Sequence, residues 1–286
     1  MNWQKVPLCA GLTFVATPIG SARDITLRAL DVLASADVLA AEDTRTLRHL
    51  MEIHGVPLAD RPMIAYHDHN GADVRPRLIR LMQDGKSLAY ASEAGTPAIA
   101  DPGFTLARDA LEQGLPVTSA PGPSAVITAL SIAGLPTDRF LFAGFLPPAK
   151  GARGQALGEL GAVPATLVIY ESPKRVHRTL NEMCEAWGND RQGAVCRELT
   201  KKFEEVKRGT LAELADWCAG RSLKGEVVLL VDRDRRQATG EDMESALETA
   251  MQTMSVKDSA TAVSEALGLP RRKVYQAALA MAKDDQ

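Results

Sequence analysis

The chain has 286 residues, of which 45% are hydrophobic and 24% are charged, and its mean hydropathy is −0.10. This composition is typical of a globular protein and excludes a disordered, collagen-like or coiled-coil chain. A net charge of −3 excludes a chain that is basic throughout, so a polyanionic partner needs a local basic patch. Four cysteines without a CxxC pair, and no apolar stretch of ~18 residues, predict a reduced cytoplasmic protein that contacts no membrane.

The first half of the chain alternates short apolar runs with segments of helical period, as in an α/β sheet with crossover helices. We expect parallel strands at residues 12–17, 38–41, 63–66, 87–91 and 116–119. One helix carries Leu27, Leu30 and Leu33, with Asp24 as its expected cap. Further helices are expected at residues 44–54, 74–82 and 105–113.

After Pro121-Gly122-Pro123 the pattern of the sequence changes, with fewer helices between the expected strands. A helix at 124–133 precedes strands that predict a mixed sheet, at residues 140–145, 165–170, 194–199, 202–207 and 226–231. Residues 146–161 contain two prolines and four glycines and predict a mobile loop. Residues 233–240 read as a linker to a helix-turn-helix-like tail, with helices at 259–267 and around 274–281. The expected domains are therefore 12–122, 123–235 and 236–286.

Three turns share one design, with small residues and proline at the carboxyl end of a strand. They are residues 17–21, 92–97 and 120–124, and the segment Ala100-Asp101-Pro102-Gly103 extends the second. Ligands of open α/β sheets bind at this edge, and glycine allows backbone to approach them closely. We therefore expect one small-molecule cleft. The turns match neither G-x-G-x-x-G nor the P-loop pattern, so a dinucleotide or nucleoside triphosphate site has no support.

Two polar segments follow strands of the first half. Glu42 and Asp43 predict substrate positioning or general-base work, against the alternative that Asp43 caps a helix beside a surface Arg45. His67 and His69 have the spacing of a metal pair, but a third ligand lacks sequence support, so we expect no metal. Hydrogen bonding to a substrate or a neighbouring loop is the favoured interpretation of these histidines.

Basic side chains gather in two segments of the second half. Lys174 and Arg175 lie at the start of an expected helix, which is a natural seat for phosphate. Residues 197–202 repeat the mixture of cations and carboxylate. The alternative at Lys174 and Arg175 is ordinary solvation of that helix face, whereas the two clusters together could form the local basic patch that the net charge does not reveal. In the tail, Arg271-Arg272-Lys273 starts a helix, and a solvated helix end is favoured there over nucleic-acid contact.

Many short motifs occur together in one order. They are TPIG (17–20), DITLRA (24–29), EDTR (42–45), HDHN (67–70), AGTP (94–97), DPG (101–103), PGP (121–123), AGLP (133–136), DRF (138–140), YES (170–172), RELTK (197–201) and KGE (224–226). This set closely resembles the small-subunit ribosomal RNA methyltransferases of the tetrapyrrole methylase superfamily. The resemblance runs from about Leu12 to the end of the chain.

The resemblance implies a two-domain α/β tetrapyrrole-methylase-like (class III) fold, with a parallel N-terminal sheet, a mixed C-terminal sheet and a helical tail. It also implies S-adenosyl-L-methionine as cofactor, a homodimer, and methylation of a cytidine ribose 2′-hydroxyl in the decoding centre of 16S rRNA, in the 30S subunit. By motif position the cofactor would be bordered by Pro18, Gly20, Glu93, Gly95, Thr96, Pro97, Ala100, Asp101, Pro121, Gly122, Pro123 and Ser124.

By motif position, the resemblance also implies a set of residues that face the RNA or the reacting hydroxyl: Glu42, Arg45, His69, Glu171, Lys174, Arg175 and Lys201. One of Asp43, Glu198 or His67 is expected to accept the hydroxyl proton, and these three stay unranked. Ser21 and Glu93 depart from the family pattern, which generally has Asn and Asp there. Two alternatives remain open: a methylase of a tetrapyrrole precursor, and a non-catalytic ligand-binding module.

Overall fold

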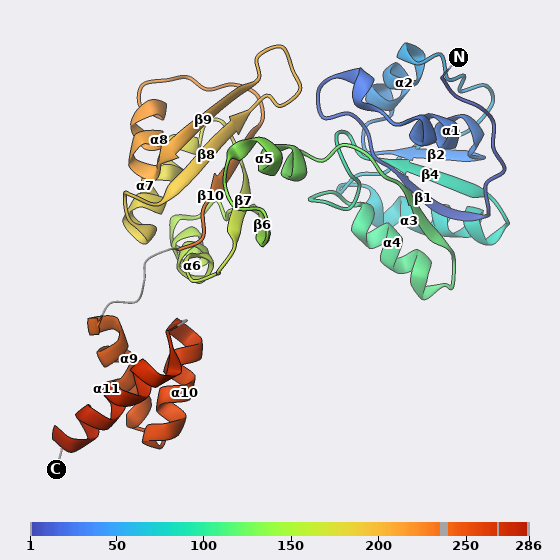
Figure 1. Ribbon diagram of the computed structural model, residues 1–286. Helices are drawn as coiled ribbons and strands as arrows, with labels where there is room; N and C mark the ends of the chain where they lie inside the picture. Colours follow the sequence, from blue (N-terminus) through green and yellow to red (C-terminus); the bar gives the residue numbers. More distant parts are fainter. Residues whose placement is uncertain (1, 235–239, 268, 285–286) are drawn as a thin grey trace. The chain divides into compact units, whose positions relative to one another are not determined.

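The computed structural model describes residues 2–234, 240–267 and 269–284 (Figure 1). The chain divides into two compact units, residues 1–234 and residues 235–286. The first unit contains two five-stranded sheets, and the second contains helices. Among the described residues no helix is long and apolar enough to cross a membrane.

The first sheet is parallel throughout, with the strand order β3-β2-β4-β1-β5. Its strands are β1 (Gly11–Val15), β2 (Val38–Ala41), β3 (Met63–Ala65), β4 (Ser87–Ala91) and β5 (Val117–Ala120). The helices of this half are α1 (Leu27–Ser35), α2 (Thr44–Ile53), α3 (Gly71–Gln83) and α4 (Gly103–Glu112). This confirms the expected parallel α/β sheet.

Both faces of this sheet are covered, as a parallel sheet requires. Leu39 and Ala41 of β2 pack on the face of α1 and α2, whereas Val38 and Ala40 pack on the face of α3 and α4 (Figure 1). Successive side chains of a strand point to opposite faces, so an unbroken apolar run is buried on both sides. The sheet is therefore buried on both faces, and its loops lie at the strand ends.

The cap of α1 differs from the sequence expectation. Thr26 caps this helix, and its hydroxyl accepts a hydrogen bond from the backbone N–H of Ala29 at 3.2 Å. The expected cap, Asp24, instead lies in a short 3-10 helix, η1 (Ala22–Asp24). The prediction was wrong because Asp24 and Thr26 are both good capping residues, and the extra turn moves the helix start by two positions.

The second sheet is mixed, with the order β6-β7-β10-β8-β9. Its strands are β6 (Phe140–Phe145), β7 (Thr166–Glu171), β8 (Gln192–Arg197), β9 (Glu205–Thr210) and β10 (Val227–Val231). Only the β6–β7 pair is parallel. Helix α5 (Ala125–Ala133) packs on one face, and α7 (Val176–Trp187) and α8 (Leu211–Cys218) pack on the other. The expected mixed sheet is confirmed.

The expected loop at residues 146–161 was wrong, because α6 (Lys150–Gly161) occupies most of it. This helix is held by tertiary contacts rather than by helix propensity. The fully buried Arg153 donates to Glu182 of α7 and, at 2.8 Å, to the carbonyl of Pro148. The indole N–H of Trp187 donates to the carbonyl of Leu157 at 2.8 Å. These contacts override the glycines that weaken the helical signal.

The second unit consists of α9 (Gly240–Met251), α10 (Val256–Leu267) and α11 (Arg271–Asp284). Its core includes Leu247, Val263 and Val274, all buried. The helix-turn-helix outline expected for residues 259–281 matches α10 and α11, and α9 was not foreseen. Gly268 and most of the expected linker, residues 235–239, lie outside the described residues.

Candidate functional site

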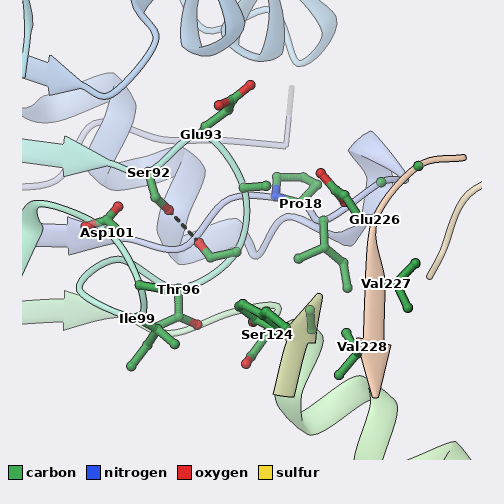
Figure 2. Close-up of a pocket in the computed structure, with 18 of the residues that line it drawn as sticks. Pro18, Ser92, Glu93, Thr96, Ile99, Asp101, Ser124, Glu226, Val227 and Val228 are labelled. Carbon is green, nitrogen blue, oxygen red and sulfur yellow. Dashed lines mark hydrogen bonds between the residues drawn. The ribbon is translucent and has the colours of Figure 1, made fainter. Parts of the chain in front are cut away.

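A cleft of about 620 Å³ lies at the carboxyl ends of the first sheet (Figure 2). Loops after β1, β2 and β4 and the start of α5 form one wall, which we call the first wall. Loops and strands of the second sheet form the second wall. The volume falls within the ~300–1,000 Å³ typical of small-molecule sites. The first wall contributes Pro18, Ile19, Gly20, Glu42, Thr46, Ser92, Glu93, Ala94, Gly95, Thr96, Ile99, Ala100, Asp101, Ser124 and Ala125.

Hydrogen bonds join the three expected turns into one surface. Thr17 and Gly95 exchange backbone hydrogen bonds of 2.9 and 3.0 Å, which links the first turn to the second. The hydroxyl of Ser92 donates to the carbonyl of Gly95 at 2.9 Å (Figure 2). The hydroxyl of Thr96 donates to the carbonyl of Pro123 at 2.9 Å, which links the second turn to the third. The turns thus hold one another in place before any ligand binds.

Two glycines of these turns are required by packing between loops. A Cβ on Gly20 would lie 2.5 Å from Cγ of Lys201, on the second wall. A Cβ on Gly122 would lie 2.9 Å from Cβ of Ala16, in the loop after β1. Glycine therefore permits the close approach of protein to protein at both positions, in addition to any approach to a ligand.

The loop after β4 stores backbone strain. Ala98 and Ala100 have φ values of 68° and 57°, in the left-handed region that residues with a Cβ rarely adopt. Asp101 holds the loop: one carboxylate oxygen accepts from the backbone N–H groups of Ala98 at 2.9 Å and Gly103 at 2.6 Å. Its other oxygen accepts from the Tyr90 hydroxyl at 3.1 Å. Asp101 is thus a positioning residue for this part of the cleft.

The first wall is acidic, and its carboxylates form no ion pairs among the described residues. Burial raises the pKa of Glu42 above its ordinary value, opposed by a hydrogen bond from the backbone N–H of Glu93, and nearby Asp101 raises it further. Burial likewise raises the pKa of Asp101 despite its hydrogen bonds. None of the ion pairs found among the described residues joins a cation to Glu42, Glu93 or Asp101. A cationic ligand would therefore meet a favourable electrostatic potential here.

The second wall is ion-paired. Lys201 Nζ donates to Glu198 Oε1 at 2.9 Å and to Glu226 Oε2 at 3.0 Å. Lys201 holds the pKa of Glu198 below its usual range. Burial opposes the charged form of Lys201, but its two carboxylate partners outweigh this and raise its pKa. This wall contributes Phe145, Tyr170, Glu171, Ser172, Pro173, Lys201, Gly225, Glu226, Val227 and Val228 to the cleft.

Glu171 and Arg175 form an ion pair within the second wall, at the end of β7. The Glu171 side chain is fully buried, and its carboxylate pairs with Arg175 at 3.0 Å and accepts from the Thr179 hydroxyl at 2.7 Å. Arg175 also donates to the carbonyl of Leu146 at 2.8 Å. Lys174, in contrast, is exposed beside the cleft residue Pro173. Of the two cations expected to seat phosphate, Lys174 is the accessible one.

The candidate proton acceptors lie in different settings. Asp43 caps α2 through the backbone N–H of Arg45 at 2.8 Å, and the Arg45 side chain holds the pKa of Asp43 far below its usual range. Glu198 engages Lys201, and neither Asp43 nor Glu198 lines the cleft. His67 also lies outside the cleft lining, with its ring 6.0 Å from that of His69.

The structure brings together only part of the residues expected at the site. Those that line the cleft are Pro18, Gly20, Glu42, Glu93, Gly95, Thr96, Ala100, Asp101, Ser124, Glu171 and Lys201. Those that do not are Asp43, Arg45, His67, His69, Pro97, Pro121, Gly122, Pro123, Lys174, Arg175 and Glu198. No group of three metal-ligating side chains occurs in the part of the chain that the structure describes.

Sequence reasoning missed most of the second wall. Tyr170, Gly225 and Glu226 belong to the short motifs YES and KGE, so their proximity to a site had a signal in the sequence. Val227 and Val228 had none, because they read as ordinary core residues of a strand. Figure 2 shows Glu226 just before β10 and Val228 on the side of Ser124, whereas the Val227 side chain points to the other face of the strand.

Ser21 and Glu93, the two departures from the family pattern, make their observed contacts through the backbone. The N–H of Ser21 donates to the Thr200 hydroxyl at 3.1 Å, and the N–H of Glu93 donates to Glu42 Oε2 at 3.1 Å. A change of side chain at these positions leaves both donors available. The turn geometry is therefore compatible with either departure.

Models of known families match two parts of the chain. Residues 11–215 match the model described as Tetrapyrrole (Corrin/Porphyrin) Methylases. The chain belongs to this family. Residues 237–282, in the helical second unit, match the model described as RsmI C-terminal HTH domain. The tetrapyrrole methylase model covers both walls of the cleft except for Gly225 to Val228.

Relatives of this tetrapyrrole methylase carry the name ribosomal RNA small subunit methyltransferase I. The one from Mesorhizobium japonicum is 44% identical over 272 residues, 94% of this chain and 92% of the relative. Those from Pseudomonas aeruginosa and Escherichia coli O157:H7 are each 39% identical, over 95% and 94% of this chain and 98% and 94% of their own lengths. The resemblance drawn from the motifs is confirmed.

Solved structures of tetrapyrrole methylases share the fold. A cobalt precorrin-4 methyltransferase is 16% identical with a TM-score of 0.59, over 77% of this chain and 94% of that one. The uroporphyrin-III C-methyltransferase of Thermus thermophilus, complexed with S-adenyl homocysteine, is 19% identical with a TM-score of 0.54, over 77% and 96%. The expected fold class is confirmed.

Proposed function

We propose that this protein transfers a methyl group from S-adenosyl-L-methionine to the ribose 2′-hydroxyl of a cytidine in the decoding centre of 16S rRNA, on the 30S subunit. The observation that carries the proposal is the similarity to relatives named ribosomal RNA small subunit methyltransferase I, over nearly the full length of both chains. We further propose a cytoplasmic homodimer with domains at 12–122, 123–235 and 236–286.

The chemistry of the cleft fits the proposed cofactor. When bound, S-adenosylmethionine supplies an electrophilic methyl group on a positively charged sulfur. Glu42 and Asp101 present carboxylates that form no ion pair among the described side chains, which favours such a charge. Ile19 and Ile99 offer apolar surface for the purine and the methylene groups of the cofactor. Gly95, Thr96, Ala100 and Ser124 line the cleft and would provide backbone around it, while Pro97 and the turn Pro121 to Pro123 lie behind this lining.

RNA would approach from the second wall. Lys174, His177 and Arg178 are exposed on the first turn of α7 or just before it, next to the cleft residues Ser172 and Pro173. Cations beside a helix N-terminus suit phosphate groups. Arg45 and His69 are exposed or half-exposed near the first wall and would add contacts there. Holding the hydroxyl in line with the methyl group would by itself lower the barrier by several kcal/mol.

The test is transfer of label from S-adenosylmethionine to small ribosomal subunits. Purified protein is incubated with methyl-labelled cofactor and 30S subunits from a strain that lacks the activity, and nuclease fragments are mapped. We expect label on one cytidine ribose. Label on a tetrapyrrole precursor but not on RNA would support the alternative enzyme of the same fold. Cofactor binding without transfer to either acceptor would support a non-catalytic binding module.

A further inference from the structure

The proposed reaction needs a group that accepts the hydroxyl proton, and the structure separates the carboxylates of this region by their partners. Asp43 is committed to capping α2 and to Arg45, whose side chain lies 2.8 Å away. Glu198 is committed to Lys201 at 2.9 Å. A carboxylate held by a cation is a weak base, because protonation would break the ion pair. Neither side chain lines the cleft.

Glu42 has the opposite setting. It follows β2 directly, half-buried, and its side chain lines the cleft. Oε2 accepts from the backbone N–H of Glu93 at 3.1 Å, which fixes the carboxylate against the loop after β4. No hydrogen bond to Oε1 is found among the described residues, so this oxygen has no donor there.

The charges that act on the Glu42 carboxylate are negative: Asp101, Glu93 and Asp68, from the two loops packed beside it. Arg45, the nearby cation of α2, is paired with Asp43 and also acts on Glu93. Lys201, the cation of the cleft lining, is engaged by Glu198 and Glu226 on the second wall. Together with burial, these carboxylates raise the pKa of Glu42, which strengthens it as a base.

We propose that Glu42 accepts the proton of the acceptor hydroxyl during methyl transfer, an inference that rests on the function proposed above. The hydroxyl oxygen forms a bond to the methyl carbon as the bond from that carbon to sulfur breaks. The bonding pair stays on sulfur, which becomes a neutral thioether. The hydroxyl proton passes to a Glu42 carboxylate oxygen and later to solvent. Atoms and charge balance without a further reactant.

The test compares Glu42→Gln with the wild-type protein in single turnovers at saturating cofactor and RNA. The amide keeps an acceptor for the N–H of Glu93 but does not take up a proton. We expect the rate to fall at least 100-fold, the typical contribution of general-base catalysis. RNA binding measured without cofactor should stay unchanged. The matched control is Glu52→Gln, at an exposed site on α2, with the wild-type rate.

The pH profile provides a signature that a purely structural role would not produce. The wild-type rate should rise with pH through the pKa of one carboxyl group, and Glu42→Gln should lose this dependence. A carboxyl ¹³C titration of the wild-type protein without cofactor should show one glutamate, absent from Glu42→Gln, with a pKa above the ordinary value of about 4.3. Glu42→Asp should recover part of the rate.

Three results would overturn the assignment, and they are distinguishable. A Glu42→Gln rate within tenfold of wild type, with wild-type transfer present, removes Glu42 as the proton acceptor but leaves the proposed function standing. An ordinary or lowered pKa for Glu42 in the ¹³C titration does the same, even if the variant fails to fold. Absence of transfer by the wild-type protein overturns the proposed function, and this inference with it.

Discussion

The two walls of the cleft differ in whether their carboxylates form ion pairs with cations. On the first wall, Glu42 and Asp101 are half-buried and form no ion pair among the described residues, and burial raises both pKa values. On the second wall, Glu171 pairs with Arg175, and Glu198 pairs with Lys201. A buried carboxylate with no cation is costly to maintain, whereas a paired one stabilises its own loop.

This difference indicates that the two walls have different roles. The unpaired carboxylates of the first wall are suited to a cationic cofactor and to proton transfer, since their charge remains available to a ligand. The paired carboxylates of the second wall shape the loops that present Lys174 and neighbouring cations. Backbone strain does not follow this difference, because Ala98 and Ala100 beside the first wall and Glu198 and Thr200 beside the second all have positive φ values.

The largest expected effect tests the ion pair between Glu171 and Arg175 on the second wall. Glu171→Ala removes a fully buried carboxylate and leaves Arg175 and Thr179 without their partner. We expect the free energy of unfolding to fall by about 3 kcal/mol, as for a broken buried ion pair. Denaturant unfolding measures the change. Glu185→Ala, at an exposed site on the same helix α7, is the matched control. Unchanged stability with weakened RNA binding would show that Glu171 faces the substrate instead.

A smaller effect is expected on the first wall. Asp101→Ala leaves two backbone N–H groups and the Tyr90 hydroxyl without their acceptor. Unfolding free energy should fall by about 2 kcal/mol, less than the lost hydrogen bonds suggest, because a buried unpaired charge is removed with them. Calorimetric cofactor affinity should fall at least tenfold as the strained loop relaxes. Asp84→Ala, exposed at the end of α3, should change neither quantity; unchanged affinity in Asp101→Ala would refute its positioning role.

Periodicity predicted both sheets because strands buried on both faces carry unbroken apolar runs, as in Val227–Val231. It failed at α6, where Arg153 and Leu157 make contacts with distant residues that no local pattern encodes. It also placed the strand after Thr200 three residues too early, since Glu198 and Thr200 turn the chain through left-handed backbone first. Local rules cannot anticipate either feature.

The site, like the fold, was predictable from the sequence where the signal is local and unpredictable where it depends on distant contacts. The turns after β1, β4 and β5 had strong local signals in proline and glycine, and the structure brings them together. Which carboxylate carries a free charge had no local signal. Glu42 and Asp43 are adjacent in sequence, yet only Glu42 lines the cleft, while Asp43 caps α2. That distinction depends on Arg45 and on the loop of Glu93, and so on the assembled fold.

The smallest expected effect compares Glu42→Gln with Glu198→Gln in stability against pH. The folded pKa of Glu42 is raised, so its ionisation destabilises the fold as pH rises through that value; Glu42→Gln should unfold about 1–3 °C above wild type at pH 7. The folded pKa of Glu198 is lowered, so its stabilisation is lost as pH falls; Glu198→Gln should unfold about 1–3 °C below wild type at pH 7.

The difference for Glu42→Gln should shrink as pH falls through the raised folded pKa of Glu42 and vanish below the ordinary glutamate pKa of about 4.3, whereas the difference for Glu198→Gln should persist to lower pH and be lost only as pH falls through the lowered folded pKa of Glu198. Differential scanning calorimetry from pH 8 down to the acid unfolding limit measures both. Shifts of the same sign at pH 7 would mean that the two walls do not differ in how their charges are neutralised.

The claim that the first wall serves proton transfer and the second wall serves RNA binding is tested most directly by single-turnover methyl transfer. The rate is measured against RNA concentration for Glu42→Gln and for Lys174→Gln in parallel. The account predicts that Glu42→Gln lowers the maximal rate at least 100-fold with unchanged half-saturation. Lys174→Gln should raise the half-saturating RNA concentration and reduce its salt dependence by about one phosphate contact, with the maximal rate kept. A lower maximal rate in Lys174→Gln, or weaker RNA binding in Glu42→Gln, would contradict it.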